Sequence, residues 1–399
     1  MIKRKKDKDD ATCPEQGHGE QDLALGVMLA ALMVALMLAA GPSYASTTFS
    51  VNSTTDHSDA NLSVGACETG YQVPGSGGAM EAECTLRVAI EQANYTTGAD
   101  TINFSIAGSG VKNISPTAQL PTINGPVSIN GYSQPAARPN QKALGTDAVL
   151  KIELSGAEAP GADGLVIGGA NSTVKGLVIN HWSQGIRIDG SGATGNRIQG
   201  NYIGTDKNGT APLGNFAVGI LISGPSNNTI GGGQAGAGNV ISANGRSSDY
   251  EGVSIYGDGA TGNRVLSNSV FASGGIGIDL AAESPTADDP DDADTGANYL
   301  QNFPILSSAR KNATGTTTVR GELDSTPNQT FRVQFFSNPK GTDEGKTFLG
   351  SQLVSTDGSG DASFTYSTKK HIMLGQNITA TGPGGNTSEF SAPKTVVES

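Results

Sequence analysis

Gly185-Ile186-Arg187-Ile188 and Gly219-Ile220-Leu221-Ile222 are two copies of the phrase that decides the fold: glycine, apolar residue, any residue, apolar residue. Five copies occur between Gly164 and Leu280, and the others begin at Gly164, Gly252 and Gly275. Successive copies start 21, 34, 33 and 23 residues apart. A unit of about 22 residues, twice lengthened by about 12, indicates a repeat architecture.

The repeated runs are strands. Their apolar residues lie two positions apart, which is the period of a β-strand and not of a helix. The runs are short, rich in Ile and Val, and bounded by the turn formers Gly, Asn, Ser and Asp. No segment between them is long and apolar enough for a crossover helix, which excludes a doubly wound sheet. We therefore predict a parallel β-helix, with coils about 4.8 Å apart.

Stacked coils place equivalent residues above one another, so the aligned phrases predict three inward apolar columns. The first contains Ile167, Ile188, Ile222, Ile255 and Ile278, the second Val174, Ile198, Ile230 and Val265, and the third Ile179, Ile203, Ile241 and Val270. Asn201, Asn239 and Asn268 align in the same way. Their amides are expected to hydrogen-bond from coil to coil, because an amide both donates and accepts.

A second informative stretch, Cys84-Thr85-Leu86-Arg87-Val88-Ala89-Ile90, precedes the repeats. Leu86, Ala89, Ile90 and Ala93 have helical spacing and predict an amphipathic helix. Such a helix is expected to cover the open end of the first coil. Cys67 and Cys84 are an even pair, which in an exported chain predicts a disulfide; two free thiols are the alternative.

The repeats and the Cys84 stretch resemble the right-handed parallel β-helix proteins of the pectin-lyase-like superfamily, in particular bacterial secreted proteins with a CSLREA-type domain. The resemblance covers roughly residues 47–391. Thr85 and Val88 depart from the motif, which has Ser and Glu there. The resemblance implies an all-β fold: a right-handed parallel β-helix with an N-terminal capping helix, followed by a small β-sandwich.

The chain divides into five expected parts. They are a signal peptide or membrane anchor (1–45), a CSLREA-like N-terminal cap (46–99), the parallel β-helix (100–281), an acidic linker (282–302) and an Ig-like β-sandwich (303–392). In the last part five strands are expected between Thr317 and Thr381, and Gly384–Ser391 resembles the closing strand of bacterial Ig-like domains.

Residues 1–45 have the organisation of an export signal. Lysines and an arginine precede the apolar run Leu23–Ala40, and the small residues Ser43 and Ala45 favour cleavage before Ser46. The 18-residue run is also at the lower limit for a membrane span, so an uncleaved anchor is the alternative. Either form predicts an extracellular or cell-surface location, with the membrane contacted only through this segment.

The candidate ligand-binding residues lie in turns and inserts. His181-Trp182 follows a strand, and a surface Trp would stack on a sugar; the alternative is a Trp that covers the coil edge. Two inserts, Gly204–Asn215 and Gly231–Gly238, are expected to form the rims of a shallow groove; the alternative is that both are surface length tolerated at little entropic cost. Tyr202, Asp206 and Lys207 are its candidate sugar-binding residues.

The acidic segment after the repeats is a candidate metal site. Asp289, Asp291, Asp292 and Asp294 match part of an EF-hand-like calcium loop, and a solvated acidic linker is the alternative. Calcium is the one candidate cofactor that the sequence offers.

The net charge of −12 argues against nucleic acid as a partner. The carboxylate, histidine and arginine motifs of polygalacturonases are missing after residue 45, so no catalytic residue is assigned. The preferred hypothesis is a secreted or cell-surface, non-enzymatic protein used for adhesion or contact with a polysaccharide or cell-surface glycan. A polysaccharide lyase or glycoside hydrolase with a diverged site, and a structural envelope spacer, are the alternatives; the oligomeric state is left open.

Overall fold

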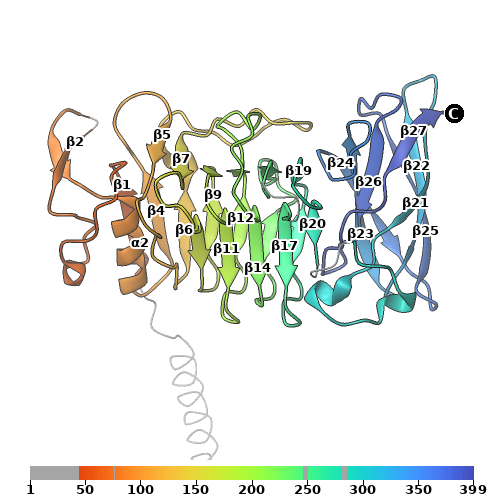
Figure 1. The fold of residues 1–399 in the computed structure, drawn as a ribbon, viewed down its shortest axis with the longest axis horizontal. Coiled ribbons are helices and arrows are strands. Elements are labelled where there is room, and N and C mark those ends of the chain that lie inside the picture. The colour runs from red at the N-terminus through yellow and green to blue at the C-terminus, as the bar shows by residue number, and fades with distance from the viewer. Residues whose placement is uncertain (1–44, 76, 246–249, 281–284) are drawn as a thin grey trace, which may run out of the picture. The chain divides into compact units, whose positions relative to one another are not determined.

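The computed structural model describes residues 45–75, 77–245, 250–280 and 285–399. Its coils are built from strands that stack in parallel sheets (Figure 1). The first coil sheet contains β1 (Thr48–Val51), β4 (Asp100–Phe104), β6 (Val127–Asn130), β9 (Thr173–Lys175), β12 (Arg197–Gln199), β15 (Thr229–Gly231) and β18 (Arg264–Leu266).

The second coil sheet contains β5 (Lys112–Ile114), β7 (Ile152–Ser155), β10 (Leu177–Asn180), β13 (Tyr202–Ile203), β16 (Val240–Ser242) and β19 (Ser269–Phe271). The third contains β8 (Leu165–Ile167), β11 (Ile186–Asp189), β14 (Ile220–Ser223), β17 (Val253–Tyr256) and β20 (Ile278–Asp279). The chain visits the sheets in turn, so the predicted all-β, β-helix-like fold is present.

The predicted signal peptide or anchor, residues 1–45, lies outside the described residues except for Ala45. Within the described ranges, no helix combines the length and the apolar character needed to cross a membrane.

The inward columns follow the strand registers. Val174, Ile198, Ile230 and Val265 pair in sequence, as do Ile179, Ile203, Ile241 and Val270, and all are buried. In the first column the prediction for Ile278 is wrong, because Ile278 pairs with Val253 and not with Ile255. The phrase occurs twice there in overlapping form, at Gly275 and Gly277. The copy at Gly277 is the one in register, since its carbonyl accepts from Val253 N.

Buried asparagines connect the coils, as predicted for Asn201, Asn239 and Asn268. The backbone N of each donates to the side-chain oxygen of the next, at 2.9 Å in both steps. Two further ladders were not predicted: Asn196–Asn228–Asn263–Asn298 and Asn215–Asn244. Each ladder supplies acceptors to backbone N–H groups at corners between sheets, where no strand partner can satisfy them.

The region before β4 contains η1 (Leu62–Val64), the hairpin β2 (Gln72–Pro74) and β3 (Met80–Ala82), and α2 (Leu86–Tyr95). Helix α2 begins after Thr85, whose side chain accepts from Val88 N as an N-cap. Its buried face, Leu86, Ala89, Ile90 and Ala93, packs with the apolar core of the coils. The predicted disulfide between Cys67 and Cys84 is present, with Cα atoms 5.1 Å apart.

The C-terminal part is a seven-stranded sheet of order β24-β23-β26-β27-β21-β22-β25. The strands are β21 (Ile305–Lys311), β22 (Thr317–Asp324), β23 (Thr330–Asn338), β24 (Thr347–Ser355), β25 (Asp361–Thr368), β26 (Asn377–Thr381) and β27 (Lys394–Glu398). β22 to β26 match the five predicted strands closely, and neither β21 nor β27 was predicted. Gly384–Ser391, predicted as the closing strand, is not a strand.

Gly384–Ser391 instead contacts the last coil. Asn386 Oδ1 accepts from Gly262 N, Thr387 Oγ1 accepts from Val265 N, and a carboxylate oxygen of Glu389 accepts from Leu280 N. The segment preceding β21 contains η3 (Pro290–Asp292) and η4 (Ala297–Leu300), and Asn298 of η4 ends the longest asparagine ladder. Polar backbone groups exposed by the last coil are therefore satisfied by these two segments.

Candidate functional site

A groove of about 560 Å³ lies on the outer face of the second coil sheet. Val240 of β16 and Ser269 and Phe271 of β19 line it, and their side chains point away from the core that Ile241 and Val270 occupy. The other lining residues come from four loops and from the start of β24 with the residue before it: residues 140–143, 145–146, 209, 232–236, 238–239, 267–268 and 346–348. We call this site the outer-face groove.

Residues of both predicted inserts line the outer-face groove: Gly209 comes from the first, and Gly232–Gly236 with Gly238 from the second. The loop at residues 140–146 forms another side, and sequence reasoning did not connect it with this site. Its position depends on Tyr202, whose hydroxyl is 2.7 Å from Thr146 Oγ1. Tyr202 is 3% exposed and does not line the groove, so its role is to support the loop.

Asp206 and Lys207, the other predicted residues of this site, stabilise their own loop. Burial alone would raise the pKa of Asp206, but amide hydrogen bonds from Thr210 and Ala211 hold it below its usual value. Lys207 Nζ donates to Asn208 Oδ1. Neither Asp206 nor Lys207 lines the groove.

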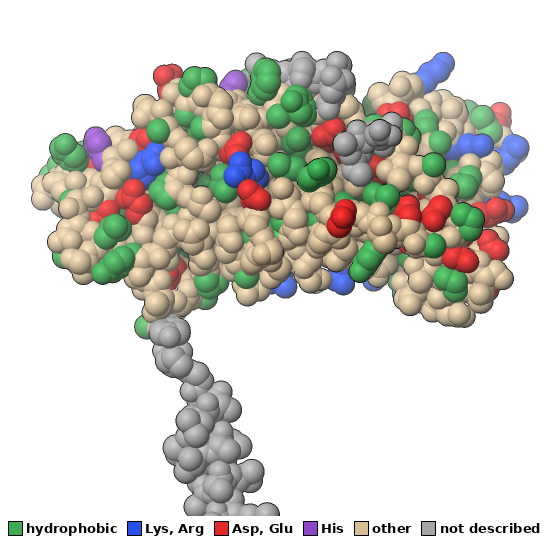
Figure 2. All heavy atoms as spheres, turned by 60° about the horizontal axis from the view of Figure 1, so that its bottom comes forward, with side chains coloured by type: hydrophobic (Ala, Val, Ile, Leu, Met, Phe, Trp, Pro, Cys, Tyr) green, Lys and Arg blue, Asp and Glu red, His purple; other side chains and the backbone are tan. Residues whose placement is uncertain are grey.

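The groove offers amides, hydroxyls and two lysines. Asn140, Gln141 and Gln234 contribute amides, and Lys346 Nζ lies 4.6 Å from the centroid of the Phe271 ring. No Asp or Glu is among the described residues that line it. On the face in Figure 2, acidic and basic side chains are scattered among uncharged ones.

The predicted pair His181-Trp182 lines a second cavity, of about 550 Å³. Trp182 is 1% exposed and its Nε1 donates to Leu154 O at 3.0 Å, so the indole packs in the coil as the alternative interpretation expected. His181 Nδ1 is 2.9 Å from Asn180 Oδ1. The aromatic ring available to solvent is that of Phe216, which is 60% exposed. We call this cavity the Phe216 pocket.

Sequence reasoning missed Phe216. The available signal was its place directly after the first insert, where the chain returns to the coil. Its backbone N donates to Trp182 O at 2.7 Å, and Asn215 before it belongs to an asparagine ladder. The coil therefore fixes the position of a residue whose side chain it does not bury.

The candidate calcium ligands lie partly together. Carboxylate oxygens of Asp289, Asp292 and Asp294 fall within 4.8 Å of one another. Burial, reinforced by the neighbouring carboxylates, raises the pKa of Asp294 to about 6, and one oxygen each of Asp289 and Asp294 is buried without a hydrogen bond. Asp291 is outside this cluster: its side chain is exposed and its backbone N donates to Asp324. The arrangement fits either alternative, a cation site or an acidic linker.

Two carboxylates flank one arginine on the outer face of the third coil sheet. Arg187 contacts Asp163 at 3.0 Å and Asp189 at 3.1 Å. Burial raises the pKa of Asp163, and the charge of Arg187 opposes this shift. Both carboxylates are thus held in ion pairs with the same guanidinium, and neither lines the groove or the Phe216 pocket.

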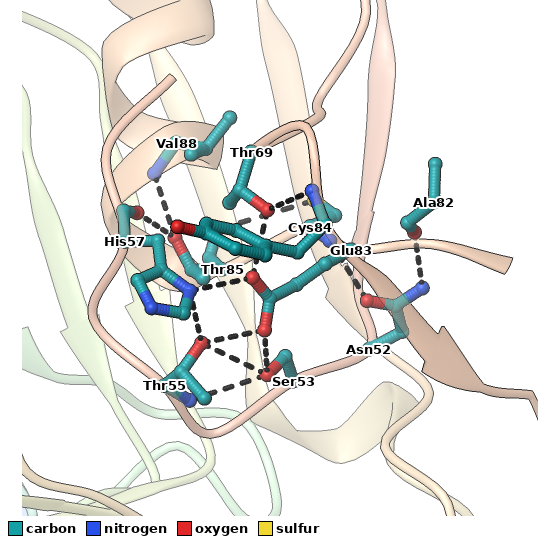
Figure 3. A network of polar contacts seen from close by, with 11 residues as sticks. Asn52, Ser53, Thr55, His57, Thr69, Ala82, Glu83, Cys84, Thr85 and Val88 are labelled. Atoms are coloured by element: carbon teal, nitrogen blue, oxygen red, sulfur yellow. Dashed lines mark hydrogen bonds and ion pairs between the residues drawn. The ribbon is translucent and has the colours of Figure 1, made fainter. Parts of the chain in front are cut away.

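A polar network around Glu83 stabilises the region before the coils (Figure 3). The carboxylate of Glu83 accepts hydrogen bonds from the hydroxyl groups of Ser53, Thr55 and Thr69. Its Oε2 atom lies 2.7 Å from His57 Nδ1. Burial alone would raise the pKa of Glu83, but these hydrogen bonds lower it to about 2. Glu83 directly precedes Cys84 of the disulfide, so the network holds the chain that leads into α2 rather than forming an open site.

No protein-family model matches this chain. No curated protein is similar to it at a significant level. The CSLREA-type and Ig-like resemblances therefore remain hypotheses, and the β-helix-like fold with its two cavities is the basis for inferring function.

Proposed function

We propose that this protein is a secreted or cell-surface, non-enzymatic β-helix protein that contacts carbohydrate through the outer-face groove. The observation that carries the proposal is the lining of that groove: glycine backbone, amides and hydroxyls from loops on a rigid sheet, with no carboxylate among its described residues. Loops held by a rigid scaffold are the usual place for recognition.

The chemistry of the groove suits a hydroxylated ligand. The glycines let a ligand approach the backbone closely, and Asn140, Gln141 and Gln234 offer both donors and acceptors. Phe271 and Val240 add apolar surface for the C–H faces of sugars. Much of the groove is open and polar, so we expect weak binding that becomes useful through repeated contacts along a polymer.

The lyase or hydrolase alternative has a specific observation in its favour, the Asp163–Arg187–Asp189 cluster. Glycoside hydrolysis needs one carboxyl group to act as acid and another as base or nucleophile. Here both carboxylates are paired with Arg187, outside the two cavities. The non-enzymatic function is therefore preferred, and an envelope spacer without a ligand is the third candidate.

The finer family assignment belongs to the same proposal. Residues 46–99 would be a CSLREA-like cap of a right-handed parallel β-helix, because the apolar face of α2 packs on the first coils. Residues 303–392 would be an Ig-like β-sandwich, because Phe335 of β23 stacks on Tyr366 of β25 with ring centroids 4.1 Å apart. An extracellular or cell-surface location follows from the proposed export signal and accords with the disulfide.

A bulky residue at Gly233 tests the groove. A side chain there meets no atom within 4 Å, so Gly233→Leu should narrow the groove without straining the coil. Gly358→Leu is the matched control, because Gly358 is equally open and lies outside the groove. Retention of the exported protein on immobilised polysaccharides should fall for Gly233→Leu alone.

Three other results would change the conclusion. Equal retention of the two variants would remove the groove as the site. Reducing ends or unsaturated products released from a retained polysaccharide would favour the enzyme. Absence of retention on every polysaccharide tested would favour the spacer.

A further inference from the structure

The Phe216 pocket combines an exposed aromatic ring with a lining of small residues. Gly156, Gly161 and Gly214 line it together with Ala157 and Pro160. At Gly156 a Cβ atom would lie 2.6 Å from Trp182, so this glycine is needed for the indole to pack. At Gly161 a Cβ atom would meet nothing within 4 Å, so the space beside it belongs to the pocket.

Phe216 is held at the rim from both sides. Its backbone N donates to Trp182 O, and Ala217 N donates to Ser183 O, both at 2.7 Å. A fixed backbone leaves the ring only its side-chain rotamers, which lowers the entropy cost of stacking a ligand on it. An exposed ring on a rigid support, beside a cavity, is thus prepared for a flat apolar partner.

Most polar groups in the lining of the pocket are uncharged. Its described lining residues include no Lys, Arg, Asp or Glu. The hydroxyl of Ser183 has no hydrogen-bond partner within the described part of the chain, and the glycine backbone adds further polar groups. His181 is the one titratable side chain in this lining. A charged ligand would lose hydration without gaining a Lys, Arg, Asp or Glu partner, which is costly. A neutral ligand with hydroxyl groups would keep its hydrogen bonds.

We propose that the Phe216 pocket binds one neutral pyranose ring, with a C–H face stacked on Phe216 and hydroxyl groups directed to Ser183 and the glycine backbone. A pyranose has both an apolar face and a hydroxyl rim, which is the combination that the pocket offers. The cavity volume of about 550 Å³ lies in the range of small-molecule sites. The inference rests on the proposed function in one respect, the carbohydrate class, and adds a second site of different character.

The chain carries its own reporter for this site, because Trp182 is its only tryptophan and lines the pocket. Titration of the exported protein with methyl glucopyranoside, methyl galactopyranoside and methyl mannopyranoside should give a saturable change in Trp182 emission for at least one of them, at millimolar concentration. Phe216→Ala should weaken that affinity about fivefold, since aromatic stacking contributes roughly 1 kcal/mol. Phe216→Tyr should preserve it.

Two controls separate stacking from other effects. Phe216→Leu keeps an apolar side chain without an aromatic face and should behave like Phe216→Ala. Tyr256→Ala removes an equally exposed ring from β17, outside the pocket, and should leave the titration unchanged. Glucuronate and galacturonate should bind more weakly than the neutral glycosides, because the described lining carries no Lys or Arg to pair with a carboxylate.

The proposal is overturned if neither Trp182 emission nor saturation-transfer NMR detects a neutral glycoside, or if Phe216→Ala binds as well as the unchanged protein. Tighter binding of phenol than of any glycoside would make the pocket an aromatic site and would also overturn it. Gly233→Leu separates the two sites: it should lower polysaccharide retention while leaving the Trp182 titration intact. If the unchanged protein is retained on polysaccharide but shows no saturable change in Trp182 emission, the pocket proposal is refuted and the groove proposal stands.

Discussion

Asn239→Ala should destabilise the coils severely, because Asn239 is the middle residue of a buried amide ladder. Its side-chain oxygen accepts from Asn201 N at 2.9 Å and from Asn201 Nδ2 at 3.1 Å. Its Nδ2 donates to Ile198 O and to Asn268 Oδ1, both at 2.8 Å. The residue is 1% exposed, so water cannot easily replace these partners.

The magnitude follows from what the substitution leaves behind. Asn201 N–H loses its acceptor, and an orphaned buried donor costs about 1–3 kcal/mol. Asn201 Nδ2 keeps Val174 O, and Asn268 Oδ1 keeps the backbone N of residue 239, so those groups lose only one bond each. With about 1 kcal/mol for each remaining neutral bond and a small cavity, we expect about 4 kcal/mol in total.

Urea unfolding followed by Trp182 emission and by far-UV circular dichroism measures this change. Asn113→Ala is the matched control: Asn113 is an exposed asparagine in β5 of the same sheet, and its loss should change stability by less than about 0.5 kcal/mol. The double variant Asn201→Ala with Asn239→Ala should cost about 1–2 kcal/mol less than the two single changes added, because they share bonds. A cost for Asn239→Ala below about 1 kcal/mol, or strict additivity, would refute the ladder as a stabilising element.

Three further predictions concern the two ends of the coils. Reduction of Cys67–Cys84 should lower the free energy of unfolding by about 3 kcal/mol through loop closure, with loss of amide protection first in α2; two alkylatable thiols in the secreted protein would contradict the bond. Calcium should raise the thermal midpoint if the cluster of Asp289, Asp292 and Asp294 binds it, more at pH 7.5 than at pH 5 because protons compete, and Asp292→Asn should remove the effect; an unchanged midpoint at millimolar calcium would favour the acidic linker. Burial, with a smaller effect of the Asp279 charge, raises the pKa of Glu389 from 4.5 to about 7. Its contribution to stability is therefore fully present below pH 4.5 and lost as the pH rises through 7. The protection factor of Leu280 N, which is corrected for the base-catalysed intrinsic rate of exchange, should therefore be lower at pH 8 than at pH 5.5. Glu389→Gln should flatten that pH dependence, and an equal dependence in both proteins would rule out Glu389 as its source.

The strands of the coils were predictable because every repeat meets the same physical requirement, the burial of alternate aliphatic residues. The same requirement explains the error at Ile278. Gly275 and Gly277 begin overlapping copies of the phrase, and both copies satisfy the alternation equally well. The hydrogen bonds from Gly252 N to Ile276 O and from Val253 N to Gly277 O select the register, and they depend on how the preceding coil is stacked.

Residues whose environment is set by other coils were harder to predict. Trp182 is buried against Leu154 of the preceding coil, whereas Phe216 is exposed although it follows a similar turn. In the C-terminal part, Gly384–Ser391 resembles the closing strand of Ig-like domains but satisfies polar groups of the last coil instead. The ladder through Asn298 joins coil and acidic segment across 35 residues, a pairing that no local pattern signals.

In the first insert, the residues that fix the fold differ from those available to a ligand. Its ends are fixed, since Gly204 and Asn215 are buried and Leu213 N donates to Gly204 O. Its middle is exposed, and Asp206 closes the turn with hydrogen bonds from backbone groups of the same loop. Gly209 of this insert lines the outer-face groove and Gly214 lines the Phe216 pocket. One loop thus shapes a wall of both cavities, while the coils beneath depend on the inward columns and the amide ladders. Substitutions in its exposed middle can therefore change what the surface binds at little cost in stability.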